Sequence, residues 1–123
     1  MAAEVDMELK KGFQELQIQK IETTNKVKQM EAQMEALKRS SQHSKVTQTE
    51  LNALPEETHM FEGVGRMFVL RNRTDINKLL EQKMETNNEK VKQLEQNKQY
   101  FESKVKESEN NLRELINNKK LNK

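Results

Sequence analysis

Few residues of this 123-residue chain have the type and spacing that catalysis or metal binding requires. The chain has no cysteine, which excludes a thiolate nucleophile, a disulfide framework and a zinc–thiolate site. Its two histidines, His43 and His59, have no partners at metal-ligand spacing. The Gly63-Val64-Gly65 segment lacks the downstream Lys-Ser/Thr pair of a phosphate-binding loop. We therefore assign no catalytic, cofactor-binding or metal-binding residue and expect no enzyme activity.

The composition favours long helices that bury one narrow stripe each. Charged residues make up 34% of the chain, aromatic residues 4%, and the formal net charge is +2. The interleaved charges lack the concentrated basic face of a nucleic-acid-binding protein. The first residues lack the apolar core of a signal peptide, and the longest apolar run, Met67–Leu70, is too short to cross a bilayer. We therefore expect a soluble, cytoplasmic protein.

Two long segments without proline, about 5–45 and about 75–121, are patterned in heptads. Alternate steps of four and three residues reach mostly apolar positions in both. The first series is Leu9, Phe13, Leu16, Lys20, Thr23, Val27, Met30, Met34, Leu37, Ser41 and Ser44. The second series is Leu80, Met84, Asn87, Val91, Leu94, Lys98, Phe101, Val105, Ser108, Leu112, Leu115 and Lys119. Such sustained spacing predicts two coiled-coil arms.

The two arms match each other when residues are paired so that their numbers sum to 121. Val27 then faces Leu94, and only the layer of Thr23 and Lys98 is polar on both sides. The pattern therefore predicts a mainly α fold, a long antiparallel two-helix coiled coil within one chain. A register shifted by one heptad is the alternative. A lysine at a seam position, such as Lys20, is expected to extend its ammonium outward.

The central segment, about 47–72, contains the only proline and two of the three glycines. Residues 47–50 have the spacing of a capping box, which predicts a short separate helix that ends at Pro55. Two short apolar runs then flank Gly63-Val64-Gly65. Because glycine permits the positive φ of a tight reversal, these runs predict a β-hairpin.

The predicted hairpin carries apolar side chains on both faces. An isolated two-stranded hairpin is marginal in water, its edges carry unpaired backbone groups, and the chain offers no third strand. We therefore expect hairpins from several chains to join into an intersubunit β-barrel or sheet. The alternative is a monomer whose hairpin folds back on the helix over 47–54. The residues expected to take part in assembly are Met60, Phe61, Gly63, Val64, Gly65, Met67, Phe68, Val69 and Leu70.

The order of coiled coil, central hairpin and coiled coil resembles the β-type subunits of prefoldin. The segment Glu62-Gly-Val-Gly-Arg66-Met-Phe, preceded by Thr58 and Phe61, is similar to the hairpin motif of that family. Residues 9–17 are similar to the start of eukaryotic members. Lys20 departs from the family pattern, in which an apolar seam residue is expected. Since the resemblance covers nearly the whole chain, residues 1–123 are identified as a single prefoldin β-like domain.

The resemblance implies a hexamer of two α-type and four β-type subunits, in which hairpins form barrels and coiled coils extend from them. It also implies capture of unfolded polypeptides such as actin and tubulin. These clients would be delivered to the cytosolic chaperonin without ATP. No cofactor, nucleic acid or membrane is expected as a partner.

The free ends of the two arms are the predicted client-binding tips, because frayed helix ends leave apolar side chains partly exposed. Methionine suits unspecific contact, and several weak tips gain affinity by acting together. The predicted tip residues are Val5, Met7, Leu9, Phe13, Leu112, Leu115, Ile116 and Leu121. The alternative function is a structural coiled-coil scaffold or spacer, although a scaffold does not need apolar strands in mid-chain.

Overall fold

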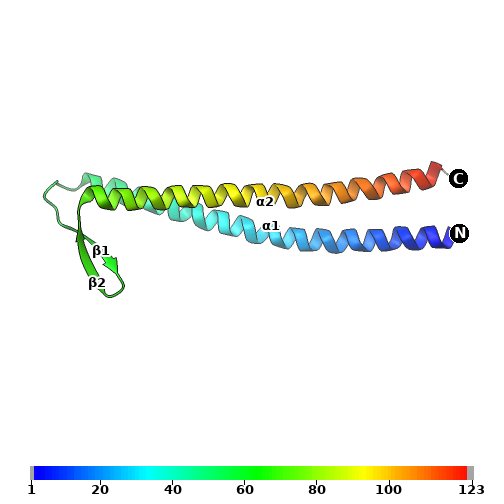
Figure 1. Ribbon diagram of the computed structural model, residues 1–123, viewed down its shortest axis with the longest axis horizontal. Helices are drawn as coiled ribbons and strands as arrows, with labels where there is room; N and C mark the ends of the chain where they lie inside the picture. Colours follow the sequence, from blue (N-terminus) through cyan, green and yellow to red (C-terminus); the bar gives the residue numbers. More distant parts are fainter. Residues whose placement is uncertain (1, 122–123) are drawn as a thin grey trace. The chain divides into compact units, whose positions relative to one another are not determined.

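Two long helices make up most of the structure, a computed structural model that describes the backbone of residues 2–121 and the side chains of residues 7–118 (Figure 1). Helix α1 spans Ala2–Ala53 and helix α2 spans Arg73–Leu121. Lysine, glutamate and glutamine fill most surface positions and are good helix formers. α1 ends two residues before Pro55, since proline disfavours helical geometry in the residue ahead of it. Within the described residues, neither helix has a stretch apolar enough to cross a membrane.

The helix predicted over 47–54 is present, but the expected break before it is wrong because α1 continues through this segment. The hydroxyls of Thr47 and Thr49 donate hydrogen bonds to the carbonyl oxygens of His43 and Lys45, at 2.9 and 3.0 Å. A threonine that bonds back to the preceding turn lies inside a helix and does not cap one. The first arm therefore extends to Ala53.

One arginine ties the end of α1 to the start of α2. Arg73 Nη2 donates to the carbonyl oxygens of Leu54 at 2.7 Å and Pro55 at 2.8 Å. Leu54 and Pro55 directly follow the last residue of α1, and the partial negative charge at a helix C-terminus favours a guanidinium there. α2 begins after Asn72, whose carbonyl accepts the first helical hydrogen bond from the Ile76 N–H at 3.1 Å.

Strands β1 (Met60–Val64) and β2 (Met67–Arg71) form the predicted antiparallel hairpin between the helices. Gly65 and Arg66 make the reversal. Gly65 has φ of 60°, a conformation that side chains disfavour, and glycine at the first of two turn residues is typical of a type II′ turn. Figure 1 shows the hairpin projecting to one side of the adjoining helix ends.

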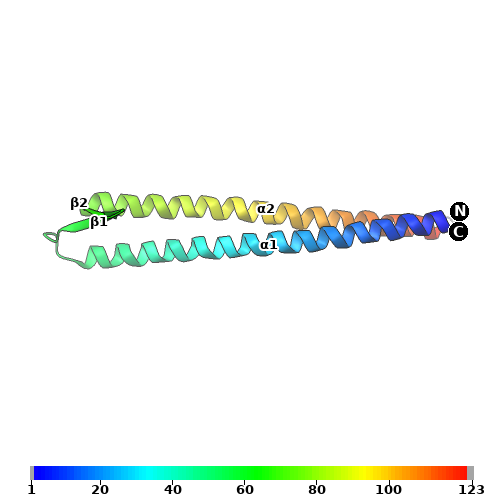
Figure 2. The same cartoon turned by 90° about the horizontal axis from the view of Figure 1, so that it is seen from below.

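The chain divides into two compact units, each built from parts of both helices. Unit 1 comprises Met1–Ala32 and Leu94–Lys123, and unit 2 comprises Gln33–Gln93 with the hairpin. Within each unit the two helical segments run antiparallel, and for unit 2 Figure 2 shows them side by side. The antiparallel helix pair predicted from the heptads is confirmed.

Polar contacts between the helices fix the register in each unit. Four side-chain pairs carry it: Lys20–Glu109 and Glu31–Lys98 in unit 1, and Gln48–Glu81 and Asn52–Asn77 in unit 2. The residue numbers of every pair sum to 129. These pairs flank the seam, and the seam residues beside them face each other at a sum of 128. The predicted pairing used a sum of 121. The predicted pairing is therefore wrong by one heptad, the shift that the pattern had left open.

The less exposed residues of both helices follow the predicted seams, with two exceptions in α1. Gly12 and Gln19 lie in the seam in place of Phe13 and Lys20, which are exposed. The seam positions over 19–30 are therefore spaced by steps of four, four and three. Eleven residues in three turns locally unwind a left-handed supercoil, because this spacing exceeds the 3.5-residue repeat.

The side chains that are buried within the described residues all lie in unit 2. Met34 and Met60 are the apolar ones, and Ser44 and Asn87 are the polar ones. Asn87 Nδ2 and Ser41 Oγ are buried without a hydrogen-bond partner. Polar atoms in a helix seam weaken the layer, but they disfavour other registers.

Candidate assembly and client-binding surfaces

One face of the hairpin is apolar and exposed. The register pairs Phe61 with Leu70 and Gly63 with Phe68, and alternate strand residues lie on the same face. Phe61, Phe68 and Leu70 therefore share a surface, the hairpin apolar face, where they are 60%, 78% and 58% exposed. Gly63 has no side chain, and the Phe68 ring lies 3.8 Å from the place of a Cβ there.

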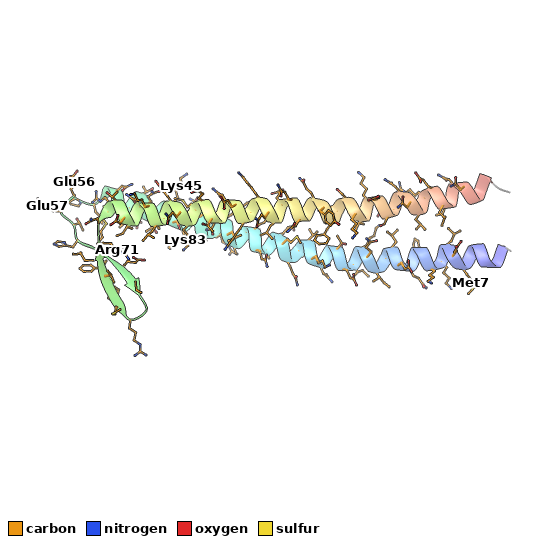
Figure 3. The ribbon with its side chains drawn as sticks, viewed as in Figure 1. Met7, Lys45, Glu56, Glu57, Arg71 and Lys83 are labelled. Atoms are coloured by element: carbon orange, nitrogen blue, oxygen red, sulfur yellow. The ribbon has the colours of Figure 1, made fainter. Side chains whose placement is uncertain are left out.

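The opposite face of the hairpin differs. It carries Met60, Glu62, Val64, Met67, Val69 and Arg71. Met60 is buried by the chain itself, whereas Val64, Met67 and Val69 remain exposed. Arg71 Nε lies 2.9 Å from Glu62 Oε2, an ion pair across the strands, and Figure 3 shows Arg71 where the hairpin joins α2. This face is therefore mixed in polarity and partly covered.

The base of the hairpin and the adjoining helix ends enclose an apolar groove in unit 2. Its lining is Thr47, Leu51, Leu54, His59, Met60, Phe61, Glu62, Ile76, Leu79 and Leu80. The hairpin thus packs against the helix ends through its base, as the monomeric alternative supposes. However, that contact leaves the hairpin apolar face uncovered by the described residues.

The predicted client-binding residues lie in unit 1. Leu9 and Leu112 are half-buried in the seam, as residues that complete a coiled coil are. Four others are exposed: Met7, Phe13, Leu115 and Ile116. The side chains of Val5 and Leu121 lie outside the described residues. The structure therefore divides the predicted tip residues into a seam pair and an exposed set.

Heptad reasoning missed three exposed apolar residues of unit 1. Ile18 and Ile21 of α1 and Tyr100 of α2 are 58%, 63% and 60% exposed. All three fall at positions between those of the predicted seams, where most residues of these arms are polar. An apolar residue at a position where the pattern predicts solvent was the signal that could have found them.

Two interhelical ion pairs of unit 1 shift the pKa of one partner each. A hydrogen bond from Lys20, helped by its charge, lowers the pKa of the Glu109 carboxyl. A hydrogen bond to Glu31, together with the Glu31 charge, raises the pKa of the Lys98 ammonium. Lys20 is half exposed and lies beside the seam, so the predicted place of this lysine within the seam is wrong. Both pairs are open to solvent, and their physical role is to join the helices.

Residues 14–119 match the family described as prefoldin subunit. The chain is 49% identical to prefoldin subunit 1 of Homo sapiens over 116 residues, which cover 94% of this chain and 95% of that protein. It is 47% identical to prefoldin subunit 1 of Danio rerio over the same shares of both chains. It is also 40% identical to prefoldin subunit 1 of Arabidopsis thaliana, over 85% of this chain and 82% of that protein.

The fold is similar to a crystal structure of the prefoldin beta subunit from Thermococcus strain KS-1. The TM-score is 0.69, and the match covers 87% of this chain and 90% of that chain at 18% sequence identity. The structural likeness thus extends over both helices and the hairpin.

Proposed function

Because the chain belongs to the prefoldin family, a family of co-chaperones, we propose that it works as a β-type subunit of a hexameric, ATP-independent chaperone complex. Family membership makes other prefoldin subunits its partners. In this proposal, two α-type and four β-type subunits assemble in the cytoplasm. The complex captures unfolded polypeptides such as actin and tubulin and transfers them to the cytosolic chaperonin.

The hairpin apolar face is the observation that carries this proposal. Two phenylalanines and a leucine on a two-stranded sheet are exposed to water, and both sheet edges are unpaired within the described residues. Burial of each such side chain against a neighbour contributes about 1.5–3 kcal/mol. Hairpins of related subunits supply both the apolar cover and the strand pairing, so a shared β-barrel is the assembly that this surface favours.

Client capture is assigned to unit 1, where the exposed tip residues lie. The exposed tip residues lie among many polar and charged side chains and are Met7, Phe13, Leu115 and Ile116. Such side chains make weak, unspecific contacts with apolar segments of a non-native chain. Six coiled coils in one complex would add these weak contacts by avidity, without requiring a particular client sequence.

A structural scaffold remains the second candidate, supported by the long interhelical seam. A scaffold needs the helices alone, whereas the hairpin apolar face has no part in spacing two partners. The two functions therefore differ in what the hairpin does, and a test on Phe61 and Phe68 separates them.

The test replaces both phenylalanines by serine in the full chain and purifies it from cells with its partners. Native mass spectrometry should find the unaltered chain in a six-chain complex and the F61S/F68S chain alone. Helix content, measured by far-UV circular dichroism, should be nearly unchanged because both residues lie outside α1 and α2. The matched control is Y100S, since Tyr100 is an aromatic residue as exposed as Phe61.

Complex formation by the F61S/F68S chain would refute assembly through the hairpin. The purified complexes are then mixed with actin diluted from denaturant, and light scattering follows aggregation. The unaltered and Y100S complexes should suppress it without ATP, and unsuppressed aggregation would refute the chaperone function itself.

A further inference from the structure

Helix α1 carries large apolar side chains that its seam does not use. Met7, Phe13, Ile18 and Ile21 lie within fifteen residues and are 73%, 52%, 58% and 63% exposed. We name this set the outer patch. Figure 3 shows Met7 projecting from the side of α1 that faces away from α2. Two of the four residues, Ile18 and Ile21, are not explained by the helix pair or by the predicted tips.

Helix geometry places the outer patch on one side of α1. From Met7 to Ile18 is eleven residues, about three full turns, and Ile21 follows less than one turn later. Phe13 lies at the flank of this row. The half-buried Leu16 and Thr23 lie on the opposite side, towards α2. The outer patch is therefore a second apolar surface of the helix, separate from the seam.

Three lysines lie on or beside this side of α1, against one acidic residue, Asp6. Lys10 and Lys28 lie between the Phe13 and Ile21 rows, and Lys11 lies just beyond Ile18. Within the described residues, no ion pair engages any of these three ammonium groups. A depression in the surface beside Met7 is also lined by Lys10 and Lys11, together with Glu8 and Gln14. The apolar side chains are thus framed by available positive charge.

The size of the outer patch limits what can occupy it. Its four side chains offer roughly 400–500 Å², about half of the ~800 Å² that each partner contributes to a stable interface. That area is too small to hold a permanent subunit and suits a short segment bound reversibly. The lysine frame favours a segment whose neighbours are acidic, because opposite charges speed and orient the encounter.

From this area and charge we infer that the outer patch binds short apolar segments of non-native polypeptides that are flanked by aspartate or glutamate. The inference rests on the proposed chaperone function and names the surface and the client chemistry that it uses. It shares Met7 and Phe13 with the predicted tips. It differs from capture by their exposed α2 residues, Leu115 and Ile116.

The test uses two photoreactive peptides with one apolar core of leucine and phenylalanine, flanked either by aspartates or by lysines. Each is cross-linked to the purified complex that contains this chain, and mass spectrometry locates the attachment sites. On this chain, the aspartate-flanked peptide should attach mainly within 7–28, at least tenfold more than the lysine-flanked peptide at low salt. The preference should decline with rising salt.

Two variants separate the apolar and the charged contributions. I18S/I21S should reduce attachment within 7–28 about tenfold, whereas K10Q/K28Q should retain attachment and lose most of the preference for aspartate flanks. Y100S, an exposed residue of α2, is the matched control and should behave like the unaltered chain. Circular dichroism and native mass spectrometry verify that each variant chain is helical and assembled, and K10Q/K28Q provides the test if I18S/I21S fails to assemble.

Attachment concentrated on 112–116, or unchanged in I18S/I21S, would overturn the outer patch and leave the chaperone proposal standing. Equal attachment of both peptides would overturn the acidic preference. A complex that attaches neither peptide and suppresses no aggregation would overturn the proposed function, and the outer patch with it.

Discussion

Replacing Asn87 by leucine should stabilise the helix pair of unit 2. Asn87 is 6% exposed, and its Nδ2 has no hydrogen-bond partner. An unpaired buried donor costs about 1–3 kcal/mol, and a buried leucine contributes about 1.5–3 kcal/mol. Leucine is larger than asparagine, and overpacking offsets about 1–3 kcal/mol of this gain. The net increase in unfolding free energy is about 2 kcal/mol, or roughly 6–12 °C in Tm for a chain of this size.

The same substitution should weaken the choice of register. At the observed sum of 128, Asn87 is opposite Ser41, a layer that is polar on both sides. At a sum of 121 it would be opposite Met34, where its amide would be buried against an apolar side chain. Leucine removes that penalty, so both registers become accessible.

Two measurements check these expectations. Urea unfolding followed by circular dichroism measures the free energy, with N88L as control because the neighbouring Asn88 is exposed and its replacement should change stability by less than about 0.5 kcal/mol. Since the chain has no cysteine, K20C/E109C and K20C/E102C pairs report the observed and shifted registers through a short bismaleimide. In the chain that keeps Asn87, only the first pair should cross-link. In the chain with leucine at position 87, both pairs should cross-link. An N87L chain no more stable than the unaltered one would refute the reasoning.

Two further predictions concern unit 1. Gly12→Ala should raise the unfolding free energy by about 0.5 kcal/mol in urea titrations. Alanine gains about 1 kcal/mol of helix propensity, and its Cβ, 3.3 Å from Leu112 Cδ1, displaces only a flexible side-chain end. A lower unfolding free energy would mean that packing outweighs propensity. The lowered pKa of Glu109 means that its stabilising effect is present above the ordinary value of 4.5 and is lost as pH falls through the lower folded value. The Tm of the unaltered chain should therefore exceed that of E109Q at pH 7, with the difference vanishing near pH 2, and a difference independent of pH would contradict the Lys20 pairing.

The helices and the hairpin could be predicted because their signals are local and repeated. Five heptads without proline predict a helix even though lysines and serines occupy some predicted seam positions. Each helix buries a whole stripe and does not depend on a single residue. The hairpin follows from two apolar runs around Gly65, whose positive φ was the conformation that the reversal required. Neither inference depends on contacts between distant parts of the chain.

The register error and the helix-end error have one cause. At a sum of 121, residues 47–53 would be opposite 68–74, where the hairpin ends, and would have no partner in the second arm. That pairing was acceptable only because the first arm was predicted to end near residue 45. Once α1 continues to Ala53, its last turns need partners in α2, and the pairing moves by one heptad. The contacts of Gln48 with Glu81 and Asn52 with Asn77 are those partners. A capping-box pattern alone cannot decide this, since threonine bonds equally well to the preceding turn.

Surfaces for partners are harder to predict than seams for a physical reason. A seam repeats because every turn of a helix must bury the same side. Its period can therefore be detected even where some seam positions are polar. The outer patch has only four residues, and nothing inside the chain requires it to repeat. Met60 is buried and Phe61 is exposed, and this difference likewise depends on where the last turns of α1 lie beside the hairpin. An apolar residue that the chain's own packing leaves exposed is therefore best recognised after the seam has been located, as a departure from the period that the seam explains.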